Sequence, residues 1–394
     1  KTLFIMKKFL LLGAAAMMAC AANAQTLEKL WSHGMTNYGA AVRNIVLVNG
    51  NEVAATNISF SGGADNVIFF DANGQMAKTY DVKAYLNEAQ IGTTGDDGAF
   101  TPYTLGRGID VDAVGNIIVN LGFPNATQGK EFVVIASDGT MRHIHCEVPA
   151  PGESDRADFF ACAGNINENG YFALAPNKKN YVGVYNIFEG EQDSDYSYLV
   201  DADEGSTYTN EAKVVFPNKT VTEDAEFAPE FFLYHRSLSG VRYSDGSSAF
   251  VVLNDAAFQQ GKATSTGIAA FQIDGVNYIV MPMANANGAR DSWFKVVNVA
   301  TGEIVAQDNG VGGDNAAMDY SAWVNADGTV SIAQLNQGKA LTMYKLTLAA
   351  SAIENVAADN AAVEYYNLQG VKVANPENGI FVKKQGAKAT KVVL

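Results

Sequence analysis

One kind of turn signal recurs along the chain and constrains its fold more than any other feature. Asn-Gly or Asp-Gly pairs stand between short apolar runs at Asn49-Gly50, Asn73-Gly74, Asp138-Gly139, Asn169-Gly170, Asp245-Gly246, Asp274-Gly275 and Asp327-Gly328. These pairs readily adopt the positive φ angles that two-residue β-hairpin turns require. The flanking runs, such as NIVLV, FVVIAS and NYIVMP, are rich in Val, Ile and Phe, which is typical of strands. The sequence therefore predicts an all-β chain built from hairpins, with one or two helical turns at residues 84–91.

The hairpins group into units of four strands. Residues 107–146 and 268–307 each hold two successive hairpins, and partial copies stand before, between and after them. Four strands in roughly 50 residues are typical of one blade of a β-propeller. Residues 25–349 are therefore predicted to form a propeller of about six four-stranded blades, in which the strand LEKLWSH closes the ring with the last blade. Rings of five or seven blades and a pair of β-sandwiches are the structural alternatives.

Charge is distributed unevenly along the chain. The formal net charge is −15; the first 24 residues carry +3 and the residues from Glu364 onward carry +3, which leaves −21 for residues 25–363. A body this acidic repels phosphate backbones, so nucleic acid is not an expected partner. Residues 190–230 concentrate carboxylates between few apolar residues and are predicted to be an acidic surface-loop insertion. Weak Ca²⁺ binding is the only cofactor interaction that the sequence suggests.

The first 24 residues have the pattern of a secretory signal peptide. Lys7 and Lys8 precede an apolar run that is too short to span a bilayer. An A-x-A motif then predicts cleavage between Ala24 and Gln25. Residues 1–5 precede Met6 and are interpreted as a gene-start artefact. No segment of the mature chain is predicted to cross a membrane.

Three cysteines bear on export. Cys20 allows a lipoprotein as an alternative, although its context resembles a lipobox poorly. Cys146 and Cys162 remain after cleavage, and an exported protein permits a disulfide between them. Two buried free thiols are the other interpretation, and the sequence leaves both open.

The C-terminal tail carries a basic, strand-like motif. An Ala-rich linker at 350–363 precedes residues 364–394, which read as YYNLQGVKV, NGIFVKKQG and KATKVVL. This order resembles the C-terminal sorting domain of proteins exported by the type IX secretion system. The positions that match its motif are Tyr366, Gly370, Val373, Gly379, Phe381 and Lys391. The resemblance implies recognition by the secretion machinery, and a protein that is secreted or displayed on the outer-membrane surface of a Gram-negative-type cell. A small structural cap on the propeller is the alternative.

Candidate binding residues lie in loops between the expected blades. Arg107, Asp110 and Asp112 stand in GRGIDVDAVGN, whose D-x-D spacing resembles a calcium loop but has Val114 at the third ligand position. A further candidate, Arg156, belongs to ESDRAD, and Trp293 follows the loop NANGARDS. The expected site residues on one face of the ring are Arg107, Asp110, Asp112, Arg156 and Trp293.

Other polar and aromatic residues allow both a functional and a structural interpretation. His143 and His145 share one face of a strand, which suits either a shared metal or a polar edge strand, and no third ligand is visible nearby. Carboxylates of ESDRAD suit either acid–base work on a glycoside or a solvated loop. Trp31 and Trp323 stand among strand residues and are expected to pack between blades.

No catalytic signature stands out. The chain has no G-x-S-x-G elbow, no Walker loop and no H-E-x-x-H motif. We therefore expect a binding or scaffold module for a glycan, peptide or protein. A propeller-type polysaccharide hydrolase or lyase that uses a carboxylate pair, and a structural component of the envelope, are the alternatives. Neither the ligand nor the oligomeric state follows from the sequence.

Overall fold

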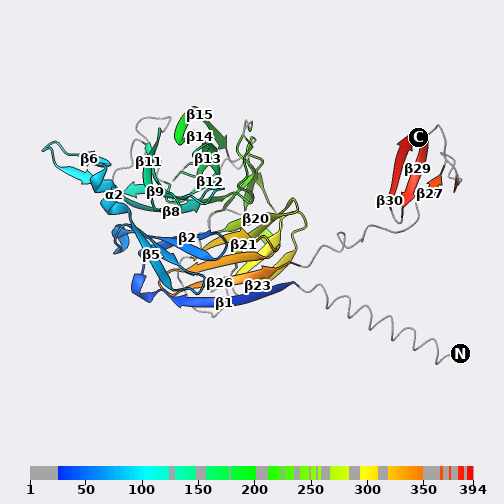
Figure 1. The fold of residues 1–394 in the computed structure, drawn as a ribbon, viewed down its shortest axis with the longest axis horizontal. Coiled ribbons are helices and arrows are strands. Elements are labelled where there is room, and N and C mark those ends of the chain that lie inside the picture. The colour runs from blue at the N-terminus through cyan, green and yellow to red at the C-terminus, as the bar shows by residue number, and fades with distance from the viewer. Residues whose placement is uncertain are drawn as a thin grey trace, which may run out of the picture. The chain divides into compact units, whose positions relative to one another are not determined.

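A computed structural model of the chain shows a six-bladed β-propeller (Figure 1). The structure describes residues 25–394 except 124–128, 148–156, 177–178, 201–211, 223–224, 226, 235–239, 248–249, 254–255, 259–266, 284–292, 309–317, 349–363, 367–371, 374–379, 386–387 and 394. Residues 25–347 form one compact unit, and the strands of the tail belong to a second. Within the described part of the first unit, six four-stranded antiparallel sheets form the blades. The predicted fold is confirmed, and the sandwich alternative is wrong.

The blades follow one another along the chain, and each is given from its innermost strand outward. Blade 1 is β2 (Val42–Val48), β3 (Glu52–Asn57), β4 (Asn66–Phe70) and β5 (Met76–Asp81). Blade 2 is β8 (Thr104–Val111), β9 (Ile117–Phe123), β10 (Gly129–Ile135) and β11 (Met141–Glu147). Blade 3 is β12 (Phe160–Asn165), β13 (Asn169–Leu174), β14 (Tyr181–Phe188) and β15 (Glu191–Val200). Blade 4 is β16 (Lys213–Val215), β17 (Phe231–Tyr234), β18 (Arg242–Ser244) and β19 (Val251–Val252); blade 5 is β20 (Ala269–Ile273), β21 (Val276–Pro282), β22 (Phe294–Asn298) and β23 (Ile304–Asp308); blade 6 is β24 (Met318–Val324), β25 (Val330–Asn336), β26 (Ala340–Thr347) and β1 (Thr26–Gly34).

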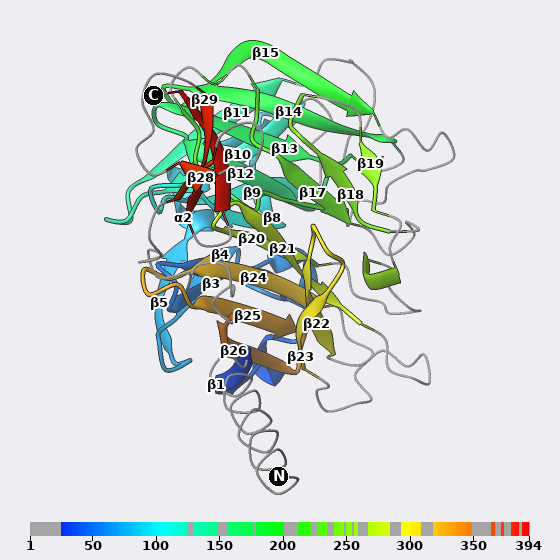
Figure 2. The same cartoon turned by 90° about the vertical axis from the view of Figure 1, so that its right-hand side faces the viewer.

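The first strand of the propeller completes its last blade. Strand β1 pairs antiparallel with β26, in a register that places Leu27 opposite Leu346 and His33 opposite Leu341. Figures 1 and 2 show β1, in dark blue, beside the orange β26. The predicted closure by LEKLWSH is therefore confirmed. Because the two ends of the propeller hydrogen-bond within one sheet, the ring has no open seam.

Each blade is buried on both faces, which explains its continuous apolar runs. On β3, Val53 and Ala55 belong to the apolar cluster shared with blade 6, whereas Ala54 belongs to the cluster shared with blade 2. All three side chains are fully buried. A strand whose two faces both contact other sheets needs apolar residues at every position, so the alternation of a half-exposed strand is absent.

Short helices and one hairpin join strands of the propeller. The predicted helical turns are confirmed as α2 (Val82–Glu88), which Asp81 caps by accepting the N–H of Ala84, and a hairpin of β6 (Gly92–Thr94) and β7 (Phe100–Pro102) follows. The described residues also include the 3₁₀ helices η1 (Thr36–Tyr38), η2 (Ser59–Ser61), which lies within blade 1, and η3 (Ala256–Phe258).

The described part of the acidic stretch at 190–230 is not a single surface loop. It contains β15, the outermost strand of blade 3, and β16, the innermost strand of blade 4. An outer edge strand tolerates charged residues because part of it faces water, and charge there also discourages edge-to-edge association. Most of GEQDSD therefore belongs to an edge strand, whereas the acidic residues within 201–211 and 223–226 lie outside the described residues.

The tail forms a small sheet of its own. Strands β27 (Glu364–Tyr366), β28 (Lys372–Val373), β29 (Ile380–Gln385) and β30 (Lys388–Val393) pair in the order β28-β27-β29-β30, and all are antiparallel. Of the motif positions, Tyr366, Val373, Phe381 and Lys391 lie in these strands, whereas Gly370 and Gly379 lie outside the described residues. In the parts of the chain that the structure describes, no helix is long and apolar enough to cross a membrane.

Trp31 links the closing strand to blade 1. Its ring lies against the β4–β5 turn, where a Cβ added to Gly74 would come within 2.5 Å of the indole. We expect Trp31→Ala to lower the free energy of unfolding by about 2–4 kcal/mol, since it removes a large side chain from a packed site. Leu30, which is 48% exposed on the same strand, is the matched control, and Leu30→Ala is expected to cost less than about 0.5 kcal/mol. Chemical denaturation of the mature chain checks this, and equal losses for the two variants would contradict it.

Candidate ligand site in the central channel

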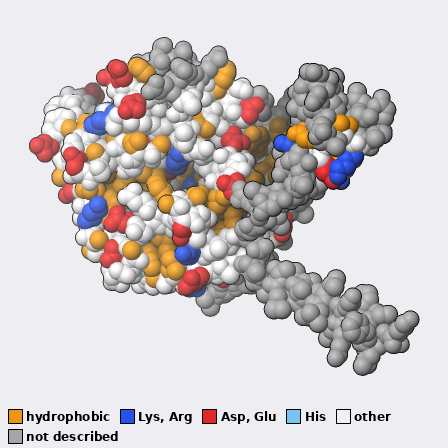
Figure 3. Space-filling view, turned by 45° about the vertical axis from the view of Figure 1, so that its right-hand side comes forward, with side chains coloured by type: hydrophobic (Ala, Val, Ile, Leu, Met, Phe, Trp, Pro, Cys, Tyr) orange, Lys and Arg blue, Asp and Glu red, His pale blue; other side chains and the backbone are white. Residues whose placement is uncertain are grey.

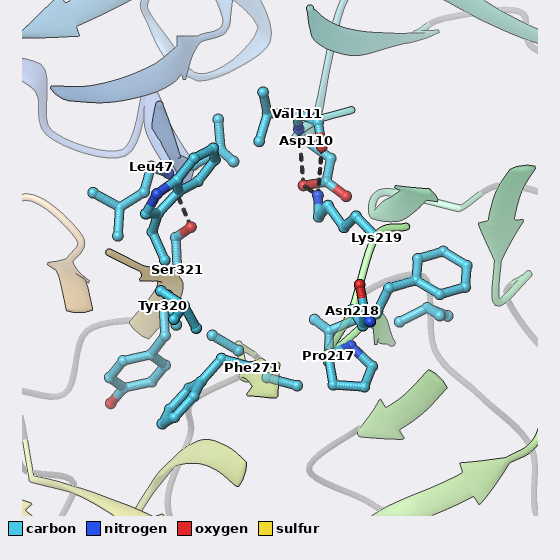
Figure 4. A pocket seen from close by; sticks show the side chains of 18 of the residues that line it. Leu47, Asp110, Val111, Pro217, Asn218, Lys219, Phe271, Tyr320 and Ser321 are labelled. Carbon is cyan, nitrogen blue, oxygen red and sulfur yellow. Dashed lines mark hydrogen bonds and ion pairs between the residues drawn. The ribbon is translucent and has the colours of Figure 1, made fainter. Parts of the chain in front are cut away.

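A cavity of about 390 Å³ lies on the axis of the propeller. Its walls come from the innermost strands of all six blades, so segments far apart in the sequence face one another across it. Figure 4 shows Leu47, Asp110, Lys219, Phe271 and Ser321 around this space. We call it the channel pocket.

The channel pocket opens where the inner strands end. The N–H groups of Ile45 and Leu47 donate to the side chains of Asp319 and Ser321, so β2 and β24 run in the same direction. Lining residues early in the inner strands, such as Ile45, are buried, whereas the later ones include the exposed Asn218 and Val324. The mouth therefore lies on the face formed by the tight turns that follow these strands. Figure 3 shows hydrophobic side chains around a hollow on one face, with a basic side chain in it.

An ion pair stands at the mouth of the channel pocket. Lys219 Nζ lies 2.5 Å from Asp110 Oδ1 and donates at the same distance to the carbonyl of Val111. Asp110 Oδ2 also accepts the N–H of Cys162 at 2.8 Å. Burial lowers the pKa of Lys219, but the charge of Asp110 more than offsets this and leaves the pKa above its ordinary value. The lysine is therefore charged, and its side chain is still 26% exposed.

Neutral polar groups and an indole complete the mouth. Asn218 Nδ2 donates to Gln272 Oε1 at 3.2 Å, and both residues line the channel pocket. Ser321 Oγ accepts the N–H of Leu47 at 2.9 Å, which leaves its own proton able to donate to a ligand. Trp323 is half-buried and lies against the Asn49-Gly50 turn, where an added Cβ would come within 2.8 Å of the ring. Trp323 was expected to pack between blades; it does so, and it also lines the channel pocket.

A second ion pair lies at the inner end of the channel pocket, opposite the mouth, and we call this end the floor. Lys213, the first residue of β16, contacts Asp319 of β24 and donates to the carbonyl of Tyr320 at 3.0 Å. Asp319 is 1% exposed, and burial raises the pKa of its carboxyl even though Lys213 opposes the shift. The N–H of Ile45 supplies a further partner at 2.9 Å. These contacts connect blades 1, 4 and 6 below the pocket.

Of the five residues expected on one ring face, Asp110 and Asp112 both line the channel pocket. Asp110 lines the mouth, as described above. Asp112 is 1% exposed, and its carboxylate accepts the N–H groups of Val114 and Asn116, so it holds the turn after β8.

Two of the other three expected residues, Arg107 and Trp293, lie outside the channel pocket. Arg107 Nη1 pairs with Asp158 Oδ2 at 2.6 Å, near the beginning of β12 and therefore away from the mouth. Trp293 just precedes β22, and its carbonyl accepts the N–H of Met283. It does not line the channel pocket among the described residues. Arg156 lies outside the described residues, as does Glu153 of the same loop.

The histidine pair contacts a carboxylate that the sequence did not single out. His143 Nε2 lies 2.5 Å from Glu131 Oε2, and His145 Nδ1 lies 2.8 Å from Glu131 Oε1. All three residues belong to the outer strands of blade 2, with β11 at the edge of the sheet. Among the described residues, no group of three or more metal-ligating side chains is arranged to hold an ion. The polar edge-strand interpretation of the histidines therefore fits this part of the structure.

The two mature-chain cysteines are free and buried. Cys146 and Cys162 form no disulfide and pack in one apolar cluster between blades 2 and 3. Burial raises the pKa of both thiols. Because the thiolate is the reactive form, neither cysteine is suited to act as a nucleophile.

Sequence reasoning missed most of the channel pocket. Asn218 and Lys219 lie within residues 190–230, which the sequence predicts to be an insertion. Gln272 and Ser321 have no sequence pattern that distinguishes them from other strand residues. The usable signal was AKVVF at residues 212–216, a short apolar run directly before PNKT. If AKVVF is an inner strand, PNKT follows its end and therefore lies at the mouth.

Comparisons with known proteins bear on the fold. The sequence matches no protein-family model and no curated protein. Among solved structures, a DUF4623 family protein from Bacteroides eggerthii is similar with a TM-score of 0.53 at 12% identity, covering 83% of this chain and 76% of that one. The Hadza microbial sialidase Hz136 is similar with a TM-score of 0.52 at 12% identity, covering 80% of this chain and 68% of that one. Identities this low support the shared propeller fold and nothing further.

The floor pair gives a test of how the channel is held together. Lys213→Met leaves the buried carboxylate of Asp319 without its counter-ion, so we expect a loss of about 3–5 kcal/mol in the free energy of unfolding. Adding Asp319→Asn removes the unpaired charge and is expected to recover most of this loss. Lys345→Met, which breaks the exposed pair with Asp327, is the control and is expected to change stability by less than about 1 kcal/mol. Urea denaturation measures all three, and a double variant no more stable than Lys213→Met would contradict the expectation.

Proposed function

We propose that the protein is a binding module whose ligand enters the channel pocket from the tight-turn face. The ligand class is a glycan, a peptide or a partner protein. The observation that carries this proposal is a pocket of about 390 Å³ with apolar walls, a polar mouth and carboxylates already engaged by the protein. A volume in this range and a few converging polar groups are typical of small-ligand sites.

The engaged carboxylates favour binding over hydrolysis. A glycoside hydrolase needs two carboxyl groups about 5–10 Å apart that can reach the substrate. Among the described residues that line the channel pocket, only Asp110 and Asp112 carry carboxylates. Asp112 is committed to its turn, and Asp110 is held by Lys219 and two backbone N–H groups. The polysaccharide hydrolase or lyase is therefore the weaker alternative.

We also propose that the chain is exported and that its tail directs delivery to the cell surface. The proposal rests on the signal-like residues 1–24 and on the sorting motif. In support, the tail strands form a separate sheet, in which Tyr366 donates to Glu364 and Lys372 contacts the same carboxylate. A basic sheet that is distinct from an acidic body offers a secretion receptor its own surface.

Ligand binding is tested at the rim of the pocket. A glycan and peptide array identifies a hit, and calorimetry then measures its affinity for the mature chain. We expect Asn218→Ala to weaken binding about tenfold, since it removes rim hydrogen bonds. Asn298→Ala is the matched control, because Asn298 holds a similar turn in blade 5 without lining the pocket. Equal effects of the two changes, or release of cleaved glycan during incubation, would count against a binding module in the channel.

Tail function is tested by deletion of residues 364–394 in a host with type IX secretion. We expect the truncated protein to accumulate in the periplasm, and its propeller to keep the melting temperature of the full mature chain. Cell fractionation and thermal unfolding give the two readouts. Unchanged surface delivery would refute the sorting role, and a large drop in melting temperature would indicate the structural cap instead.

A further inference from the structure

We infer that the channel pocket binds a neutral saccharide unit. This inference rests on the proposed function and narrows its ligand class. It follows from three properties of the pocket: its balanced charge, its mixture of donors and acceptors, and its apolar lining.

The charges that line the channel pocket cancel. Among the described residues, the charged groups are Asp110, Asp112, Lys213 and Lys219, two of each sign. Each has an oppositely charged or hydrogen-bonding partner within the protein. A ligand anion would meet a lysine that Asp110 already neutralises, inside a body whose formal charge is −21. A ligand cation would meet Lys219 beside the same carboxylate. The pocket therefore offers neither sign of charge an unpaired partner.

The hydrogen-bonding groups at the mouth suit hydroxyl groups. Lys219 uses two of its three protons, on Asp110 and Val111, and a third proton of its partly exposed side chain is left. Ser321 can donate, and Asp110, which accepts from Lys219 and from the N–H groups of Val111 and Cys162, retains acceptor capacity on Oδ2. A hydroxyl both donates and accepts, so neighbouring hydroxyls of a sugar can bond to lysine and carboxylate together without breaking the ion pair.

The pocket also has apolar lining. Trp323, on the last residues of β24, is half-buried and lines the pocket beside the Asn49-Gly50 turn. Because successive side chains of a strand alternate, Ala322 and Val324 line it from the other face of β24. A sugar ring has an apolar C–H face that packs on aromatic and aliphatic surface while its hydroxyls point elsewhere. The Lys213–Asp319 floor closes the channel below, so a terminal or side-chain sugar unit fits better than the middle of a threaded polymer.

The test uses matched neutral and acidic probes. Lactose is compared with sialyllactose, and galactotriose with trigalacturonate, by calorimetry with the mature chain at about 50 mM and about 500 mM salt; short neutral peptides form a third set. We expect a neutral sugar to bind with an affinity that changes less than about twofold between the two salt concentrations, because no net charge is exchanged. Its acidic counterpart is expected to bind at least tenfold more weakly.

The variant Asp110→Asn distinguishes a site for a neutral sugar from a site for an acidic one. It leaves Lys219 without its counter-charge, so we expect neutral-sugar affinity to fall about tenfold and the acidic probe to gain affinity. Asp71→Asn, in an exposed turn of blade 1, is the matched control and is expected to change neither affinity. The wild-type salt series remains decisive if Asp110→Asn does not fold.

Three outcomes would overturn the inference. A wild-type preference for the acidic probes, or affinity that falls more than tenfold with salt, would show an anionic ligand. Binding of peptides alone would show a different class. If Asn218→Ala abolishes that binding of acidic probes or of peptides, the proposed function stands and only the neutral-sugar inference fails. If no probe binds, and no glycan, peptide or protein ligand of the mature chain loses affinity on Asn218→Ala, both fail.

Discussion

The hydrogen-bonded pairing of β1 with β26 is the constraint on which the rest of the propeller depends. Each blade is apolar on both faces, as the buried run Val53, Ala54 and Ala55 illustrates, and both faces are covered only when every blade has two neighbours. An open ring would expose one face of two blades and the free edge of β26. Closure within a single sheet removes that seam, and Trp31 extends the contact to the turn at Gly74 of blade 1. The channel keeps its shape because the ring around it cannot spread.

The channel pocket is a consequence of strand direction. Because neighbouring inner strands run the same way, their final residues gather at one end of the axis and their first residues at the other. The early ends are closed by Lys213 and Asp319, and the late ends bring Lys219, Asn218, Gln272 and Ser321 to an open mouth. Polar groups that each look incidental on their own strand become one site because a ring of blades places them around a common axis.

Blade 4 contributes most to this site and had the weakest sequence signal. Its strands are the shortest of the six blades in the described residues, and both channel lysines, Lys213 and Lys219, come from β16 and the segment after it. Each lysine is held by a carboxylate from a different blade, Asp319 of blade 6 and Asp110 of blade 2. Because Lys213 is the first residue of β16, only a short apolar run, from Val214 to Phe216, was left in the sequence to indicate an inner strand.

Local chemistry in the sequence was sufficient for the turns, the four-strand units and the helix at α2, because each depends on residues close together in the chain. The closing strand is different, since its pairing with β26 joins residues such as Ser32 and Thr342, which lie 310 positions apart. Asn49-Gly50 and Asp274-Gly275 adopt positive φ at both residues, and apolar runs that flank the turns pair with their neighbours. The tail likewise shows its strands in its own sequence.

The channel pocket could not be predicted in this way. Asp110 was recognised, but its partner Lys219 lies 109 positions along the chain, and the pairs that form the site join different blades. Which lysine meets which carboxylate, and which other contacts Arg107 and Trp293 make instead, was decided by ring geometry. Turn and strand preferences act over a few residues, whereas convergence on an axis depends on the packing of all six blades.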